Sequence, residues 1–246
     1  MCHSDESSPP RAAGAVAAGA HTEIELTASD GNRLAAYAAR AAHGSGRGVV
    51  VMPDVRGLHG FYRELAVRFA EIGVDAVAID YFGRTAGIGD RSEAFEFRAH
   101  VEKTTPEGIA ADVAAGAAYL RSLEGGAATS IFTVGFCFGG GYSWRQSADQ
   151  PGLTGAIGFY GRPALAADRI DALRAPLLML LAGADEHLPV GGRSQGLRVA
   201  DQRGVVSTVV IYPGAPHSFF DRTAADNADA SADAWHQIRA FMDRYA

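Results

Sequence analysis

Short apolar runs alternate along the chain with longer segments in which apolar residues recur at helical spacing. The first two runs, 24–27 and 34–39, flank Asp30-Gly31-Asn32, a sequence typical of the turn of a β-hairpin. Six further runs are almost continuously apolar, as expected of strands buried on both faces of a mostly parallel sheet. These runs cover residues 48–52, 74–79, 131–134, 156–159, 177–181 and 205–211.

The segments between these runs predict helices over 61–72, 106–123, 139–148, 192–201 and 224–245. An antiparallel hairpin followed by alternating strands and helices predicts a single α/β domain over 21–246, with a doubly wound, mostly parallel sheet. The segment 83–105 is long, charged and rich in aromatic residues, so we expect a loop or short helices that cover the site. The first 20 residues have neither a basic start nor a compact apolar segment and predict a disordered tail instead of a secretory signal.

Composition narrows the possible partners. The net charge of -6 and the lack of a basic block argue against nucleic-acid binding. No apolar run approaches the roughly 20 residues that a bilayer-spanning helix needs, so we expect no membrane contact. The two cysteines, Cys2 and Cys137, are not expected to pair, and nothing indicates an oxidising compartment. We therefore expect a cytoplasmic protein that acts on a small molecule, with its oligomeric state open.

The most informative motif is Gly135-Phe136-Cys137-Phe138-Gly139, where a strand turns sharply into a helix with a cysteine at the apex. Such a nucleophile elbow leaves no room for a Cβ atom two positions before or after its apex, which accounts for Gly135 and Gly139. The start of a helix also favours negative charge on the sulfur. These features predict a nucleophile, although a buried cysteine can also be an inert small apolar residue.

Asp185 and His217 supply the two partners that a nucleophile of this kind requires. Each follows an apolar strand and a glycine-containing turn. Alone, the aspartate could be a turn or helix cap and the histidine a solvated loop residue. Hydrolases built on this elbow, however, present nucleophile, acid and histidine in this order along the chain. All three residues also fall at the carboxyl ends of strands, where an α/β sheet exposes its site, so we predict a Cys137-His217-Asp185 triad.

The elbow, together with Asp185 and His217-Ser218-Phe219, resembles the dienelactone hydrolase family, small cysteine hydrolases of the α/β-hydrolase fold. The resemblance covers essentially the whole chain after the first 20 residues, and the loops 52–58 and 80–84 also match. It implies that Cys137 attacks a lactone or ester carbonyl to form a thioester, without a cofactor, and that His217 acts as general base and acid. It further implies an oxyanion hole formed by the backbone N–H groups of Val55 and Phe138.

The same resemblance implies how a substrate carboxylate is held. Family members use two arginines, which Arg84 matches after the fourth strand and Arg222 matches with an offset of one residue. The best-studied members carry a glutamate that helps to activate the thiol, and this chain has the shorter Asp54 in its place. Tyr160, directly after its strand, is expected to border the substrate.

Other chemistry is less well supported by the residues. His59 and His187 also follow strands, but their spacing from Cys, Asp and Glu residues predicts no metal site. Three alternatives stay open: a carboxylesterase for small neutral esters on the same triad, a non-catalytic ligand-binding relative, and a redox protein. The intact triad argues against the second, and the absence of a resolving cysteine beside Cys137 argues against the third.

Overall fold

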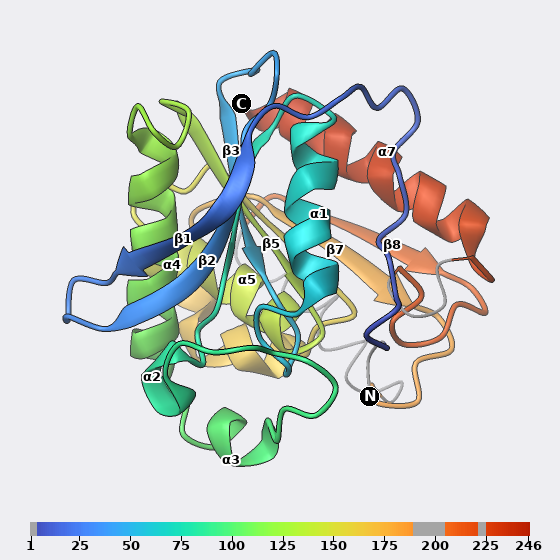
Figure 1. Cartoon of the computed structure of the whole chain (residues 1–246). Coiled ribbons are helices and arrows are strands. Elements are labelled where there is room, and N and C mark those ends of the chain that lie inside the picture. The colour runs from blue at the N-terminus through green and yellow to red at the C-terminus, as the bar shows by residue number, and fades with distance from the viewer. Residues whose placement is uncertain (1–3, 189–204, 221–224) are drawn as a thin grey trace.

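A mixed sheet runs through the middle of the molecule (Figure 1). The computed structural model describes residues 4–188, 205–220 and 225–246. Within them the sheet has eight strands in the order β1-β2-β4-β3-β5-β6-β7-β8. The strands are β1 (His21–Thr27), β2 (Arg33–Ala39), β3 (Arg47–Met52), β4 (Asp75–Ile79), β5 (Ser130–Phe136), β6 (Gly155–Phe159), β7 (Leu177–Ala182) and β8 (Ser207–Tyr212).

The predicted architecture is confirmed. β1 and β2 form the antiparallel hairpin, and β2 pairs with β4 antiparallel. Every further pair of neighbours, from β4 with β3 to β7 with β8, is parallel. The carboxyl ends of these parallel strands therefore meet at one edge of the sheet, where an α/β fold places its site.

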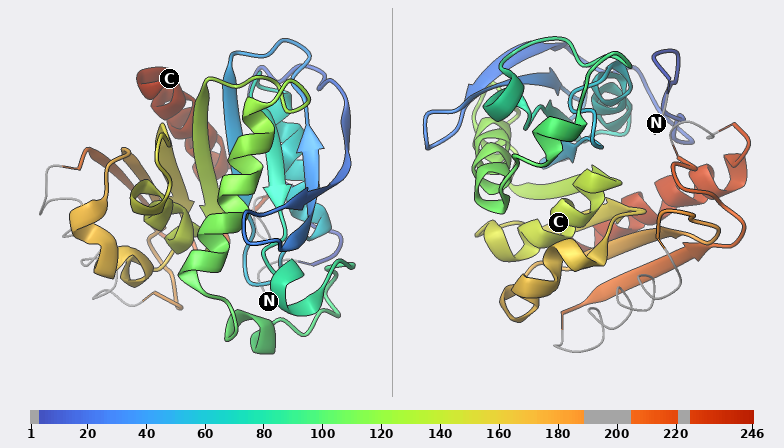
Figure 2. Two further views of the ribbon diagram at one scale, coloured as in Figure 1. Left: turned by 90° about the vertical axis from the view of Figure 1, so that its left-hand side faces the viewer. Right: turned by 90° about the horizontal axis from the view of Figure 1, so that it is seen from below.

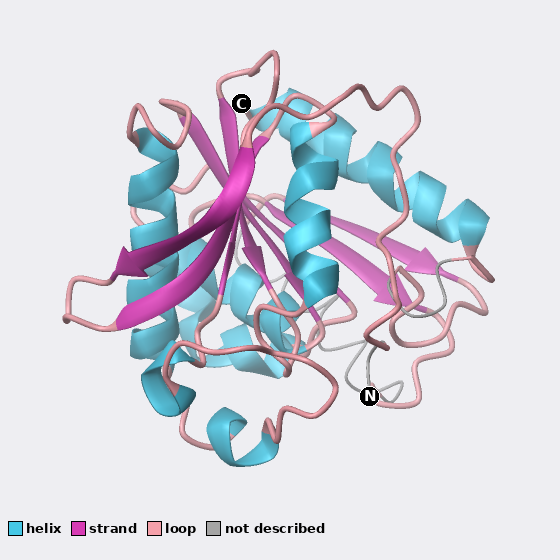
Figure 3. Cartoon of the chain, viewed as in Figure 1, coloured by secondary structure: helices cyan, strands magenta, loops and turns pink. Residues whose placement is uncertain are grey.

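Helices cover both faces of the sheet (Figures 1 and 3). One face carries α1 (Gly60–Ala70) and α7 (Ala228–Tyr245), and the other carries α4 (Pro106–Arg121) and α5 (Phe138–Asp149). Shorter elements are α2 (Gly83–Ala86), α3 (Arg98–Val101) and the 3-10 helix η1 (Pro163–Ala172), the last of which the sequence pattern did not predict. The helix predicted over 192–201 lies outside the described residues.

The two faces explain why the strand runs are continuously apolar. Val49 and Val51 of β3 pack with Phe61 of α1 and Trp235 of α7. Val50 and Met52, which point to the other face, pack with apolar residues of α4. Because successive strand residues point to opposite faces, every residue of a strand covered on both sides is buried and is usually apolar. All but the first residue of β3 is fully buried.

Residues 83–105 form the expected cover at the carboxyl edge of the sheet (Figure 2). The short helices α2 and α3 are joined by a loop that a buried ion pair fixes, with Arg91 Nε 3.0 Å from a carboxylate oxygen of Asp80 at the end of β4. The Arg91 guanidinium also lies 4.5 Å above the ring of Phe95.

Residues 4–20 differ from the disordered tail that the sequence pattern predicted. Trp235 Nε1 donates a hydrogen bond of 2.9 Å to the carbonyl of Pro10, and the N–H of Val16 donates one of 2.9 Å to the carbonyl of Glu71. Ala12 is buried in the core beneath α7. Main-chain groups and one small side chain make these contacts, so they leave no apolar periodicity for a sequence pattern to show.

Along the described part of the chain, no helix is long and apolar enough to cross a membrane.

Candidate active site

Cys137 sits at the sharp turn between β5 and α5, in a backbone conformation that non-glycine residues seldom adopt (φ 53°, ψ −110°). The two glycines of the motif allow this turn. A Cβ atom on Gly135 would lie 2.0 Å from the carbonyl oxygen of Gly139, and one on Gly139 would lie 2.3 Å from the carbonyl oxygen of Met52. The chain therefore needs glycine at both positions to hold the cysteine at the apex of the turn.

Asp185 and His217 are brought together from the ends of β7 and β8. His217 Nδ1 lies 2.8 Å from Asp185 Oδ2. The other carboxylate oxygen of Asp185 accepts hydrogen bonds from the N–H groups of His187 at 2.8 Å and Leu188 at 3.1 Å. This carboxylate is thus held in place on one side and directed at the histidine on the other.

The electrostatics of this pair favour a charged aspartate. Burial acts to raise the pKa of Asp185, but the hydrogen bond and charge of His217 and the two backbone N–H groups outweigh it, so the pKa lies below its usual value. When the His217 ring is neutral, an ionised Asp185 favours the tautomer with its proton on Nδ1, which leaves Nε2 without one. That is the tautomer a general base needs.

Cys137 and His217 line one pocket of about 460 Å³. Most of its wall is apolar. The remaining lining residues that the structure describes are Val55, Phe97, Val101, Phe138, Tyr160, Arg162, Leu165, His187 and Leu188. The pocket is of the size and character expected for a small organic molecule.

The two residues expected to form the oxyanion hole both line this pocket. Phe138 is the first residue of α5, so its N–H is among those that an α-helix leaves without an intrahelical acceptor. Val55 lies in the turn after β3. Their position beside Cys137 is compatible with the predicted role, which stays a prediction.

Tyr160 and Asp54 occupy different places. Tyr160 lines the pocket, with its buried ring 4.8 Å from that of His217, and its contact with substrate stays a prediction. Asp54 is fully buried and is not among the lining residues; its Oδ1 accepts a 2.9 Å hydrogen bond from the N–H of Arg56. The activation of the thiol by Asp54 stays a prediction.

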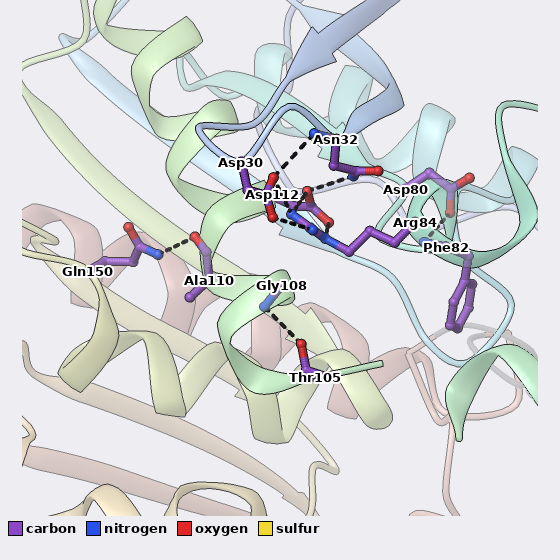
Figure 4. Close-up of polar contacts among 10 residues, drawn as sticks. All are labelled: Asp30, Asn32, Asp80, Phe82, Arg84, Thr105, Gly108, Ala110, Asp112 and Gln150. Atoms are coloured by element: carbon purple, nitrogen blue, oxygen red, sulfur yellow. Dashed lines mark hydrogen bonds and ion pairs between the residues drawn. The ribbon is translucent and has the colours of Figure 1, made fainter. Parts of the chain in front are cut away.

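Arg84 does not line the pocket, although the sequence predicted that it would hold a substrate carboxylate. Figure 4 shows its guanidinium directed at two carboxylates of the protein itself. Nε and Nη2 bind Asp112 of α4 at 2.9 and 2.8 Å, and Nη1 binds Asp30 of the β1–β2 turn at 2.5 Å. The position of Arg84 after β4 matches the family pattern, but two carboxylates distant in sequence bind its guanidinium.

Arg222 lies outside the described residues. The structure instead places a different arginine in the pocket lining, Arg162, which the sequence interpretation missed. It stands two residues after Tyr160, at the end of β6, so the rule that identified Tyr160 could also have identified it. His187 also lines the pocket, with its ring 4.9 Å from that of His217, whereas His59 is buried at the start of α1.

No group of three or more His, Cys, Asp or Glu side chains among the described residues is arranged to hold a metal ion.

Comparison with known proteins assigns the chain to a family. The model of the dienelactone hydrolase family matches residues 34–246. The chain belongs to this family. It is 29% identical over 248 residues to a protein of Salmonella typhi named "Putative carboxymethylenebutenolidase", covering 94% of this chain and 89% of that one. A protein of the same name from Methylorubrum extorquens is 24% identical over 234 residues, covering 91% and 80%.

Solved structures show the same fold. A dienelactone hydrolase-family structure from Klebsiella pneumoniae, titled "Putative Dienelactone Hydrolase", has a TM-score of 0.77 at 26% identity and covers 92% of this chain and 100% of that one. A dienelactone hydrolase-like promiscuous phosphotriesterase from metagenomic libraries has a TM-score of 0.75 at 21% identity, covering 93% and 100%. The chain is therefore a hydrolase with the α/β-hydrolase fold.

Proposed function

We propose that this hydrolase cleaves small lactones or esters, chiefly ones that carry a carboxylate, through a thioester on Cys137. One observation carries the proposal: His217, whose Nδ1 lies 2.8 Å from Asp185, lines the same pocket as Cys137. An oriented histidine beside a thiol at a helix start is the arrangement that nucleophilic acyl transfer requires.

In the first half of the reaction, the sulfur of Cys137 attacks the substrate carbonyl carbon while its proton passes to Nε2 of His217. Asp185, ionised and bonded to Nδ1, stabilises the positive ring. The carbonyl oxygen becomes an oxyanion that the N–H groups of Val55 and Phe138 stabilise. The intermediate then collapses: the bond to the alkoxide oxygen breaks, and His217 returns the proton to that oxygen.

In the second half, His217 takes a proton from water, and the hydroxide oxygen attacks the thioester carbon. Collapse releases the carboxylic acid product and expels the sulfur, which His217 reprotonates. For a lactone, the leaving alkoxide belongs to the same molecule, so a single ring-opened acid is produced.

A second candidate, hydrolysis of small neutral esters on the same triad, has one observation in its favour. Arg84, the cation that the family pattern assigns to a substrate carboxylate, is bound by Asp30 and Asp112. The largely apolar wall of the pocket also suits an uncharged acyl chain.

Replacing the nucleophile tests the mechanism. We expect Cys137→Ala to lower kcat/KM on p-nitrophenyl acetate by more than about a thousandfold, because none of the other described residues that line the pocket carries a thiol. The wild type should form a covalent acyl-enzyme whose mass increase maps to Cys137 in a rapidly quenched sample. Cys2→Ala, which removes the only other cysteine, is the matched control and should retain wild-type activity. Activity that persists in Cys137→Ala would refute the mechanism.

A further inference from the structure

Arg162 brings a positive charge to the pocket that holds Cys137 and His217. Its side chain is exposed, and among the described residues it makes neither a hydrogen bond nor an ion pair with a carboxylate. It is also the single Lys or Arg among the described residues that line the pocket. A cation in this position is available to a ligand.

Neighbouring arginines differ from it in this respect. Arg145 of α5 binds Asp149 at 3.0 Å and Asp168 at 2.5 Å. Arg169 of η1 binds Asp149 at 3.1 Å. Arg145, Arg169 and the two aspartates are therefore paired with one another, and neither aspartate has an ion pair with the guanidinium of Arg162.

The backbone that carries Arg162 is packed directly on the first turn of α5, the helix that begins after Cys137. A Cβ atom on Gly161 would lie 2.3 Å from the backbone nitrogen of Gly141, and one on Gly141 would lie 2.6 Å from the carbonyl oxygen of Arg162. Such close contact is possible only because both positions are glycine. It fixes the start of the Arg162 side chain relative to the nucleophile, which lowers the cost of ordering it around a ligand.

We propose that Arg162 binds the anionic group of the substrate and so determines the preference for carboxylate-bearing esters or lactones. The inference rests on the proposed function and assigns to Arg162 the role that the family pattern gave to Arg84. A planar guanidinium can hold a carboxylate through two parallel hydrogen bonds. Leu165, on the same side of the pocket, contributes apolar wall for the carbon atoms between that carboxylate and the scissile carbonyl.

Two matched esters test this assignment: mono-p-nitrophenyl fumarate, which carries a carboxylate, and p-nitrophenyl crotonate, in which a methyl group replaces it. The trans double bond keeps the fumarate carboxylate away from its own ester, so it cannot catalyse its own hydrolysis. The readout is the ratio of kcat/KM for fumarate to that for crotonate. We expect the wild type to favour fumarate and Arg162→Ala to lower the ratio by about ten- to hundredfold, the range of one charge-assisted bidentate contact.

Two further variants calibrate the result. Arg162→Lys keeps the charge but lacks the planar guanidinium that makes two parallel hydrogen bonds, so it should restore part of the fumarate-to-crotonate ratio. Arg169→Ala removes the same charge from η1, the 3-10 helix that begins directly after Arg162. Arg169 binds Asp149 and does not line the pocket, so the fumarate-to-crotonate ratio of this variant should equal that of the wild type.

The proposal is overturned if the wild type shows no preference for fumarate, or if Arg162→Ala leaves the ratio unchanged. It is also overturned if Arg169→Ala lowers the ratio equally, or if Arg222→Ala alone removes the preference. Equal loss of both activities in Arg162→Ala and Arg162→Lys would likewise refute a role in anion selection. Failure of the underlying mechanism is distinguishable, because crotonate hydrolysis would then survive in Cys137→Ala.

Discussion

Two arginines near the carboxyl edge of the sheet carry the same charge in opposite circumstances. On the β4 side, Arg84 is enclosed by Asp112 and Asp30, and its side chain is 18% exposed. On the β6 side, Arg162 is exposed, lines the pocket, and has no carboxylate partner among the described residues. Both follow a strand by a few residues, so their place in the sequence does not distinguish them.

The contrast shows that the surrounding charges decide the role of a cation. An arginine bound on three of its nitrogens by fixed carboxylates contributes to stability, because moving it would leave a buried charge behind. An arginine that lines a pocket and has no carboxylate partner among the described residues can instead bind a ligand. The β4 side therefore supports the fold, and the β6 side is available for recognition.

The sharpest test of this contrast is Arg84→Met, which keeps the length of the side chain and removes its charge. Asp112 is fully buried, and burial already raises its pKa above the usual value despite Arg84 and Asn32. Without Arg84, the carboxylate loses its cation, and we expect the free energy of unfolding to fall by about 3–5 kcal/mol in urea denaturation. Arg162→Met, the same substitution on the β6 side, should change it by less than about 0.5 kcal/mol.

A second substitution identifies the cause. If the uncompensated Asp112 charge destabilises Arg84→Met, adding Asp112→Asn should recover at least half of the loss, and the double-mutant cycle should report the coupling. Equal unfolding free energies for Arg84→Met and Arg162→Met would contradict the assignment of structural and ligand-binding roles.

On the β4 side, the buried carboxyl group of Asp80 should make the stability of the protein depend on pH. Burial raises the pKa of Asp80 to about 6, even though Arg91 acts in the other direction. The Asp80 carboxyl group thus stays protonated to a higher pH in the folded protein than in the unfolded chain. The stabilisation that this difference gives is full below about pH 4 and is lost as the pH rises through about 6. The total loss is about 3 kcal/mol at most.

Asp80→Asn isolates this effect, since asparagine does not titrate. The difference in unfolding free energy between wild type and Asp80→Asn should shift against the wild type as the pH rises from 4 to 7. A difference that stays constant over this range would mean that Asp80 has an ordinary pKa in the folded protein.

The smallest effect concerns salt. An exposed cation is screened by ions, so raising the ionic strength from about 0.05 to 0.5 M should lower the fumarate-to-crotonate ratio of the wild type by a few fold. In Arg162→Ala the ratio should depend much less on salt. Equal salt dependence in both proteins would place the electrostatic preference elsewhere in the molecule.

The sequence predicted the sheet and its elbow well, for identifiable reasons. Strands buried on both faces must be apolar throughout, which made β3 to β7 visible as runs. The turn at Cys137 excludes side chains at Gly135 and Gly139, so geometry imposed a motif. The 3-10 helix η1 and the contacts of residues 4–20 were missed, because neither depends on an apolar period.

By itself, the sequence determined which residues could react and which strand ends would carry them, because those features depend on local backbone geometry and on the order of the chain. Only the tertiary structure decided that carboxylates of the protein itself bind Arg84. Asp30 and Asp112 lie 54 and 28 residues from Arg84, and folding brings both carboxylates against its guanidinium. Charge pairing depends on distance in space, and residue type and sequence position do not specify that distance.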